Sequence, residues 1–442
     1  MKQKQLFIVL TAILMVCMSL HAKGHREMMV REREMIVKEE VCGFGNPADR
    51  IENTQNIHID TDFFGGNIIV ERTSSTSTQY YEIFFNDTIS IRPDLRDTEG
   101  DWFYWCFRVS GAADQTFHFE FPGKYLGSFG PAYSNDNGKT WHWLYNKVQK
   151  KLNDFSFTFG EDDHEVYFCI APLYTQADFD RFISQYESNP YISKHSLTIS
   201  EKGRNVEEIH ISHPQKRPKY KAVITCRHHA CEMTASYALE GLISAVLDEP
   251  DYEWLRQNVD FLIVPFVDKD GVEEGDQGKN RRPHDHNRDY SGESIYKSTK
   301  ALRERILQWS DGKLKVALDM HCPVLSGRWH ENIHFVGFNE KKPDNEQQKY
   351  VNILYKRQKG ELRMNPENFI LAYGTDWNVP STWSNGNFFR EWVSTVEGIS
   401  LATSLELPYA NNEGQMVTPQ NARLFGKDLA DTIQFYMQES MK

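Results

Sequence analysis

VITCRHHACEMTASYALEGL, from Val223 to Leu242, places two adjacent histidines and a glutamate between an apolar run and a run of helical composition. The run KAVITC predicts a buried β-strand, and MTASYALEGLISAVL predicts a helix. In sheets whose strands alternate with helices, active sites lie at the carboxyl ends of the strands, which is where His228, His229 and Glu232 fall. His228 stands four residues and His229 three residues before Glu232, so the spacing alone leaves open which histidine does the chemistry.

The chain from residue 190 to residue 442 shows the alternation of strands and helices that is typical of an α/β domain. The apolar segment VDFLIVPFV predicts a strand that is buried on both faces. The other predicted strands are KAVITC, KLKVALDMH and ISLATSLELPY, and the predicted helices are MTASYALEGLISAVL, STKALRERILQWS and PQNARLFGKDLADTIQFYMQES. We therefore expect residues 190–442 to form a sheet covered by helices.

Residues 50–187 differ in composition and predict a separate β-rich domain. The predicted strands are short, aromatic and β-branched, with turn residues between them: GNIIVER, QYYEIFF, DWFYWCFRVSG, QTFHFEF, FSFTFG and HEVYFCIA. Asn137-Gly138 is the dipeptide of a tight hairpin turn. These features favour an antiparallel β-sandwich of about six to eight strands, followed by a helix at Thr175–Glu187.

The N-terminus has the pattern of an export signal. Two lysines precede the apolar run Leu6–Leu20, and Leu20-His21-Ala22 fits a cleavage site, so we expect residues 1–22 to be removed as a signal peptide. The run is short for a membrane-spanning helix, so we expect no span in the mature chain. Export would place the protein in the periplasm or outside the cell. Anchoring as a lipoprotein through Cys17 is the alternative, although Met15 and Val16 are not the small residues that such a site prefers.

Composition excludes several classes of protein. Hydrophobic residues make up 40% of the chain and aromatic residues 13%, which is ample for a large core. The net charge of −12 argues against nucleic acid as the main partner. The seven cysteines form no CxxC pattern, so neither a cysteine-bound zinc site nor a dense disulfide framework is indicated. We expect buried thiols instead.

Polar clusters follow four of the predicted strands, in TCRHHACE, PFVDKDGVEEGDQGKNRRPHDHNRDY, LDMHCP and TSLELPY. A hydrolytic zinc site uses three nitrogen or oxygen ligands and keeps one position open. A His-x-x-Glu segment supplies two ligands, and His321 suits the third. In a strand that ends at His321, Ala317, Asp319 and His321 share one side, so the histidine can point into a cleft at the strand end.

Two more of these strand ends supply groups that a hydrolase needs. Glu406 can point into the same cleft from the last strand and act as a base. The planar fork of Arg288 suits a carboxylate, and Asn287 adds an amide donor.

The ordered set His229-x-x-Glu232, Asn287-Arg288, His321 and Glu406 resembles that of the zinc metallocarboxypeptidases. RHHACE is similar to the Arg-x-His-x-x-Glu of the cytosolic-carboxypeptidase-like branch, and DHNRDY, LDMHCP and TSLELPY resemble three further motifs of that branch. The segments DWFYWCFRVSG, YSNDNGKTW and VYFCIAPLYTQADFDRF resemble its N-terminal β-sandwich domain. The resemblance runs over about residues 56–437 and implies a mixed-sheet α/β/α catalytic domain behind the sandwich.

The resemblance implies one Zn²⁺ ion per chain, bound by His229, Glu232 and His321. Glu406 would be the general base that takes a proton from the zinc-activated water and passes it to the leaving amine. Asp285 would orient His229 from behind. On this alignment His228 is a neighbour that packs or hydrogen-bonds beneath the site.

The resemblance also implies a substrate site. Asn287 and Arg288 would hold the C-terminal carboxylate of a peptide. An arginine should stabilise the oxyanion, and Arg281 is our choice, with Arg282 as the competing residue. Arg390 stands where the deglutamylating members of the branch carry an arginine, which raises the possibility of an acidic preference.

These assignments predict an exported zinc carboxypeptidase that hydrolyses the C-terminal bond of peptides. The same zinc site also fits an amide hydrolase that acts on cell-wall peptides or acylated amino acids. A binding protein with a vestigial site is the third alternative. The phenolic proton donor of the family has no clear match, and Tyr373 is only a candidate.

Overall fold

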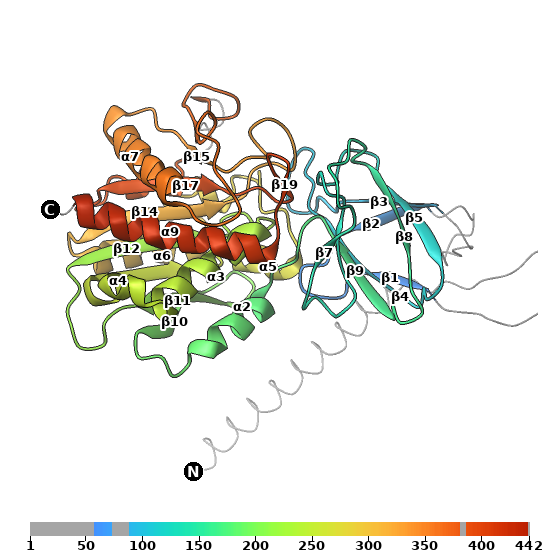
Figure 1. The fold of residues 1–442 in the computed structure, drawn as a ribbon, viewed down its shortest axis with the longest axis horizontal. Helices are drawn as coiled ribbons and strands as arrows, with labels where there is room; N and C mark the ends of the chain where they lie inside the picture. The colour runs from blue at the N-terminus through green and yellow to red at the C-terminus, as the bar shows by residue number, and fades with distance from the viewer. Residues whose placement is uncertain (1–56, 73–87, 381–385, 441–442) are drawn as a thin grey trace, which may run out of the picture.

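The computed structural model describes residues 57–72, 88–380 and 386–440, which form two parts that lie side by side (Figure 1). The N-terminal part is a pair of β-sheets, and the larger C-terminal part is a sheet between helices. The predicted signal segment 1–22 and the predicted strand QYYEIFF lie outside the described residues.

The N-terminal part is the predicted β-sandwich. One sheet has the order β1-β4-β9-β6-β7 and the other the order β2-β3-β5-β8. The strands are β1 (His58–Asp60), β2 (Ile69–Arg72), β3 (Thr88–Arg92), β4 (Cys106–Ser110), β5 (Thr116–Glu120), β6 (Ala132–Ser134), β7 (His142–Trp143), β8 (Asp154–Thr158) and β9 (Glu165–Cys169). The described residues thus carry nine strands where about six to eight were predicted, and β1, β3, β6 and β7 match none of the predicted segments. β6 and β7, of 3 and 2 residues, are too short to show an alternating pattern.

Aromatic side chains fill the space between the two sheets. Phe119 of β5 stacks on Phe155 of β8 with the ring centroids 4.9 Å apart, and Trp105 lies 5.0 Å from Phe121. The prediction of antiparallel pairing holds for the described sandwich pairs except one, because β3 and β5 run parallel. Between β3 and β5 the chain forms β4, which belongs to the five-stranded sheet. It then returns to the four-stranded sheet as β5, in the same direction as β3.

The C-terminal part is built on an eight-stranded mixed sheet with the order β10-β11-β13-β12-β14-β17-β15-β16. Its strands are β10 (Ile192–Ile199), β11 (Asn205–Ile211), β12 (Tyr220–Cys226), β13 (Val259–Val264), β14 (Leu314–His321), β15 (His334–Val336), β16 (Ile370–Leu371) and β17 (Leu401–Glu406). β12, β14 and β17 are parallel neighbours, so their polar carboxyl ends lie together at one edge.

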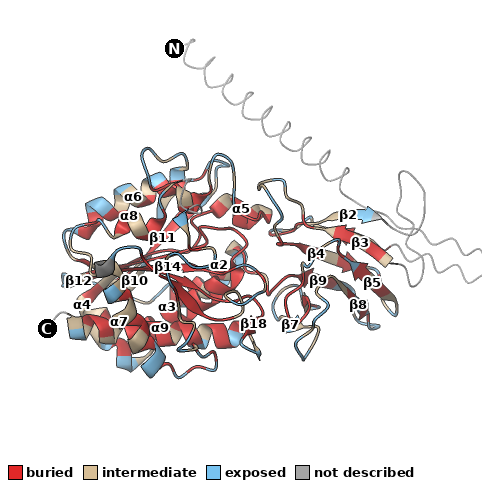
Figure 2. Ribbon diagram, turned by 90° about the horizontal axis from the view of Figure 1, so that it is seen from above, coloured by how far each residue is buried: buried red, intermediate tan, exposed pale blue. Residues whose placement is uncertain are grey.

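Helices cover both faces of this sheet (Figure 2). One face carries α3 (Met233–Asp248), α4 (Glu253–Asn258), α7 (Lys341–Arg357) and α9 (Pro419–Ser440), and the other carries α6 (Lys297–Ser310) and α8 (Phe389–Val393). Successive side chains of β14 point to opposite faces of the sheet, as predicted, and so pack in two different hydrophobic cores. Val316, Leu318 and Met320 pack in one core, and Ala317 packs in the other.

Helix α3 is held close to α9 by two glycines. A Cβ atom on Gly241 would lie 1.9 Å from the carbonyl oxygen of Arg423, and one on Gly426 would lie 1.9 Å from that of Ala238. No larger residue fits at either contact. Because Glu232 directly precedes the first residue of α3, this packing fixes the carboxylate at the sheet edge.

Helix α2 (Gln176–Ile183) follows the sandwich in the chain but packs on the α/β part. The Phe179 ring lies 5.7 Å from that of Phe266, and the Tyr174 ring 4.9 Å from that of Tyr237. The predicted domain boundary near residue 190 assigns α2 to the sandwich, although α2 packs against the α/β part.

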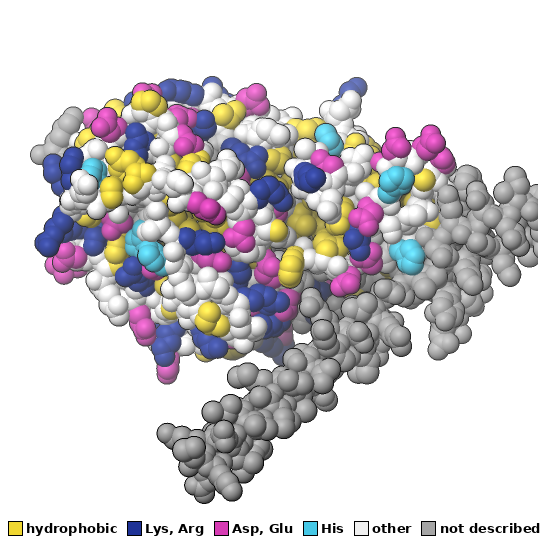
Figure 3. Space-filling view, turned by 90° about the horizontal axis from the view of Figure 1, so that it is seen from below, with side chains coloured by type: hydrophobic (Ala, Val, Ile, Leu, Met, Phe, Trp, Pro, Cys, Tyr) yellow, Lys and Arg dark blue, Asp and Glu magenta, His cyan; other side chains and the backbone are white. Residues whose placement is uncertain are grey.

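The surface and the cysteines agree with the composition. Basic and acidic side chains are intermingled over the face in Figure 3. The five described cysteines are free and buried, as predicted. Of the helices in the described ranges, none has the length and apolar character needed to span a membrane.

Candidate active site

The carboxyl ends of β12, β14 and β17 open into a cavity of about 400 Å³. Its lining includes His229, Glu232, His321, Glu406 and Arg288. The sequence had placed these five residues at separate strand ends and in the loop after β13, and the fold brings them around one space. The loop between β13 and α6, including the short helix η3 (His286–Arg288), forms the rest of one wall.

His229, Glu232 and His321 form a compact group of potential metal ligands. The Nδ1 atom of His229 lies 2.8 Å from Oε1 of Glu232, and the Nδ1 atom of His321 lies 2.8 Å from Oε2 of the same carboxylate. The three ligand atoms lie within 4.8 Å of one another, and all three residues are buried. Two imidazole nitrogens and a carboxylate are a donor set that zinc prefers.

Each of these histidines turns its other ring nitrogen towards a second carboxylate. The Nε2 atom of His229 lies 3.6 Å from Asp285, and that of His321 lies 2.5 Å from Asp319. Such carboxylate partners fix the ring orientation and the tautomer of a metal ligand. Asp285 thus lies beside His229, and Asp319 lies beside His321 in the corresponding way.

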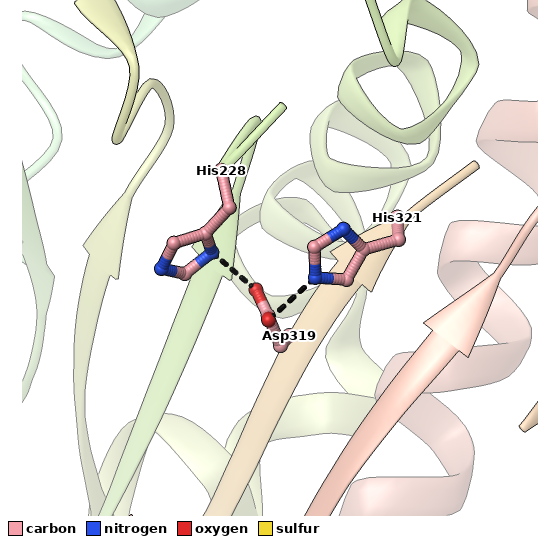
Figure 4. Close-up of side chains that lie close together, drawn as sticks. All are labelled: His228, Asp319 and His321. Atoms are coloured by element: carbon pink, nitrogen blue, oxygen red, sulfur yellow. Dashed lines mark hydrogen bonds and ion pairs between the residues drawn. The ribbon is translucent and has the colours of Figure 1, made fainter. Parts of the chain in front are cut away.

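The two adjacent histidines face different partners. Arg227 has a φ of +60°, so the chain turns as it leaves β12. His228 then lies fully buried with Nδ1 2.7 Å from Asp319 and Nε2 2.7 Å from the hydroxyl of Tyr290. Figure 4 shows Asp319 between the rings of His228 and His321. His228 is thus hydrogen-bonded to Asp319 and Tyr290, and His229 faces Glu232. His228, Asp319 and His321 also bring three potential ligand atoms within 4.8 Å of one another.

Glu406 lies directly beside His321, because the two residues are paired in the parallel register of β14 and β17. Its Oε2 atom is buried and has no hydrogen-bond partner among the residues that the structure describes. Burial raises the pKa of Glu406 to about 7, and the charge of Glu232 acts in the same direction. A buried carboxyl group with an unused oxygen at the edge of a cavity is well placed to exchange a proton.

Arg281, the predicted oxyanion ligand, lines the cavity, but its guanidinium is paired with carboxylates. Its guanidinium forms ion pairs with Asp97 at 3.0 Å, Asp268 at 2.6 Å and Asp276 at 2.9 Å, so its donors are committed to three carboxylates. The competing Arg282 is exposed, with 82% of its side chain accessible, and pairs with Glu99. The cation that reaches the ligand group comes from elsewhere in this loop.

That cation is Lys279, which is not among the predicted site residues. Its Nζ atom lies 2.8 Å from Oε1 of Glu232 and donates to the carbonyl of Cys322 at 3.2 Å. Burial acts to raise the pKa of Glu232, but Lys279 and the two histidines outweigh it and hold that pKa well below its ordinary value. The segment GKNRRP carries three cations within four residues, and no feature of the sequence distinguishes among them.

Asn287 and Arg288 both line the cavity, next to the ligand group. The amide nitrogen of Asn287 lies 3.2 Å from Nε2 of His321, and its Oδ1 atom accepts the backbone N–H of Phe389. The Arg288 guanidinium lies 4.1 Å from the ring centroid of Phe388, and its side chain is 16% accessible. A guanidinium at the wall of a cavity is suited to bind a carboxylate.

The two remaining candidates differ in position. Arg390 lines the cavity but is only 2% accessible; it pairs with Glu391 at 2.9 Å and donates to the carbonyl of Val336. Its charge is therefore partly satisfied within the protein. Tyr373 is not among the residues that line the cavity.

Comparison with known proteins agrees with this geometry. A family model described as zinc carboxypeptidase matches residues 180–431. Cytosolic carboxypeptidase 6 of Caenorhabditis elegans is 24% identical over 311 residues, which cover 62% of this chain and 64% of the relative. Cytosolic carboxypeptidase 2 of Xenopus tropicalis is 31% identical over 146 residues, which cover 31% of this chain and 15% of the relative. The chain thus spans less than two thirds of the length of each of these relatives.

Solved structures share the fold over most of this chain. A metallo-carboxypeptidase from Burkholderia cenocepacia superposes with a TM-score of 0.68 at 17% identity, over 87% of this chain and 100% of the other. A metallo-carboxypeptidase from Pseudomonas aeruginosa, in complex with (2-guanidinoethylmercapto)succinic acid, superposes with a TM-score of 0.64 at 19% identity, over the same shares. Since 87% of the chain exceeds the α/β part, the shared fold includes the sandwich.

Proposed function

The chain belongs to the zinc carboxypeptidase family, and on that premise we propose that it releases the C-terminal residue of peptides with Glu406 as general base. The observation that carries this proposal is the meeting of three kinds of group in one cavity. These are the ligand group of His229, Glu232 and His321, the unpartnered carboxyl oxygen of Glu406, and the guanidinium of Arg288.

The residues of the ligand group fit a zinc ion. Their donor atoms converge, and a carboxylate stands behind each histidine. Zinc in a site of this kind supplies a Lewis acid that polarises the scissile carbonyl and makes water more acidic. We take one ion per chain as the proposed stoichiometry.

Glu406 accepts a proton from the attacking water and delivers it to the leaving amine. Its position next to His321 keeps the carboxyl group beside the reacting atoms, and burial places its pKa near neutrality. General acid–base catalysis by a positioned carboxylate typically contributes about 10²- to 10⁴-fold. Removal of this carboxylate should therefore abolish most turnover without loss of the metal ligands.

Lys279 takes the oxyanion role that we predicted for Arg281. Its ammonium group is buried, lies against the ligand group, and carries a positive charge that stabilises the developing oxyanion. Arg288 binds the terminal carboxylate of the peptide, with Asn287 alongside it. Lys279 thus acts at the carbonyl of the scissile bond, and Arg288 acts at the carboxylate of the C-terminal residue.

The proposal is tested with pairs of peptides that differ only in their C-terminus, one with a free carboxylate and one with an amide. The zinc-loaded protein should release the terminal residue of the free peptide and leave the amidated peptide largely intact, because Arg288 lacks its partner there. Equal hydrolysis of both forms would contradict the carboxylate clamp. Cleavage of cell-wall peptides alone would select the amide hydrolase instead.

We also propose that the protein is exported after removal of residues 1–22. The support is the sequence pattern of a charged start followed by an apolar run. N-terminal sequencing of the protein recovered from its host should find a chain that begins at Lys23. A mature chain with residues 1–22 attached would contradict the proposal, and lipid attached at Cys17 would select the lipoprotein alternative.

A further inference from the structure

The sandwich part contributes one side chain to the cavity lining. Of the described sandwich residues, Trp102 is the one that lines the cavity. It lies in the connection between β3 and β4, and its side chain is half-buried. The catalytic and ligand residues proposed above all come from the α/β part, so Trp102 is the direct contribution of the sandwich to this space.

The Trp102 indole has a fixed orientation. Its Nε1–H donates to the carbonyl of Glu99 at 2.9 Å. Glu99 is itself held to the loop of the α/β part, because its N–H donates to the carbonyl of Asn280 at 3.2 Å and its carbonyl accepts from the Asn280 amide at 2.7 Å. The ring face then lies 5.7 Å from Nζ of Lys279.

Further bonds make this connection and the loop a single unit. Asp97 accepts the backbone N–H groups of Gln277 and Gly278 at 3.0 and 2.9 Å. The Gln277 side chain exchanges two hydrogen bonds of 2.8 Å with the backbone of Tyr104. These contacts join the two parts directly behind the cavity wall, so Trp102 and Lys279 hold a constant relative position.

Trp102 and the carboxylate clamp are linked to the ligand group through different residues: Lys279, beside the indole, pairs with Glu232, whereas Arg288 pairs with Asp285, which lies beside His229. Lys279, beside the indole, also bonds to the carbonyl of Cys322, which precedes the lining residues Pro323 and Val324. In the clamp, Arg288 stacks on Phe388, which in turn lies 5.7 Å from the guanidinium of Arg390. A peptide with its terminal carboxylate at Arg288 and its scissile carbonyl at the ligand group would continue along the side of Lys279, where Trp102 lines the cavity.

We propose that Trp102 forms the subsite for the side chain of the residue before the scissile bond, and that it selects apolar or aromatic side chains there. This inference rests on the proposed function, which sets the direction of the peptide. The indole face and the neighbouring Val324, which is 38% exposed, offer apolar surface at that point. The ammonium of Lys279 beside them disfavours a lysine or arginine at the same position of the peptide.

The test uses peptides that are identical except at the penultimate residue, which is Leu, Ala or Lys. The wild-type protein should prefer Leu over Ala by about tenfold in kcat/KM, as a hydrophobic pocket discriminates a few methylene groups. In Trp102→Ala this ratio should fall below about twofold, and Trp102→Phe should restore most of it. Loss of overall rate with an unchanged ratio would overturn the inference, since a merely structural role predicts that result.

Trp141→Ala is a matched control. Trp141 is also a half-buried sandwich tryptophan whose Nε1–H donates to the carbonyl three residues earlier, that of Gly138, at 3.1 Å, but it is not among the cavity-lining residues. The Leu-to-Ala ratio of this variant should equal that of the wild type. An equal fall of the ratio in both variants would also overturn the inference.

Calorimetric binding of the same peptides to the zinc-loaded Glu406→Gln protein separates this inference from the proposed function. The subsite predicts tighter binding of the Leu peptide, and loss of that difference when Trp102→Ala is added. If the wild type hydrolyses no peptide but the binding difference depends on Trp102, the proposed function fails and the subsite stands. If hydrolysis occurs but neither ratio responds to Trp102, the subsite alone fails.

Discussion

Replacement of Lys279 by methionine gives the sharpest test of which cation serves the oxyanion. The substitution keeps most of the apolar stem and removes the ammonium that lies 2.8 Å from Glu232. Loss of one oxyanion-stabilising group typically lowers kcat by about 10²- to 10³-fold, or about 2.7–4 kcal/mol. We expect a fall of that size in kcat/KM for peptides.

The same substitution should leave zinc binding intact or strengthen it. At 2.8 Å and an effective dielectric constant of about 20, the attraction between the ammonium and the Glu232 carboxylate is about 6 kcal/mol. In the metal-free protein Lys279 therefore forms an ion pair with Glu232 that competes with the binding of zinc to this carboxylate. Zinc content by mass spectrometry and competition with a chelator measure the affinity, and kcat/KM is read on the fully loaded protein.

Arg281→Met is the matched control, because it removes a second buried cation of the same loop. Its three carboxylate partners would remain buried without it, so we expect a lower melting temperature, corresponding to about 3–5 kcal/mol. Below that temperature its kcat/KM should stay within about tenfold of the wild type. Near wild-type activity of Lys279→Met, together with a loss of about 10²-fold in folded Arg281→Met, would refute the assignment of the oxyanion role to Lys279 instead of Arg281.

Three further substitutions test the site and the packing that supports it. His229→Ala should abolish zinc binding, whereas His228→Ala, which removes a ring bonded to Asp319 and stacked beside His321, should weaken it by about tenfold at most; the reverse order would mean that the register was misread. Arg288→Ala should raise KM by about 100-fold for free peptides with little change in kcat, and an unchanged KM would remove it from the carboxylate clamp. Gly241→Ala should lower the free energy of unfolding by about 1–3 kcal/mol, because its Cβ atom would lie 1.9 Å from a carbonyl oxygen of α9, and chemical denaturation measures this.

The sequence predicted the features that depend on local periodicity. Alternation in β14 correctly placed His321 opposite the apolar residues, and the polar ends of separate strands correctly indicated a common edge. Helix α9 begins and ends at the residues that its pattern predicted. The ligand group follows from these local rules together with the parallel pairing of β12, β14 and β17.

The sequence could not predict the conformation of the loop after β13. This loop is shaped by Asp97, which accepts two of its backbone N–H groups from about 180 residues away along the chain. That contact turns Arg281 towards carboxylates and leaves Lys279 beside the ligand group. The role of Trp102 depends on the same long-range contact, and a tryptophan in an aromatic strand region carries no signal for it.

The most direct test of the central claim is hydrolysis of a free C-terminal peptide by the Glu406→Gln variant with its zinc retained. The side chain keeps its size and its place beside His321, but it can no longer accept a proton. We predict release of the terminal amino acid by the wild type and a fall of at least about 10²-fold in the variant at equal zinc content. Undiminished hydrolysis by the zinc-loaded variant would contradict the account.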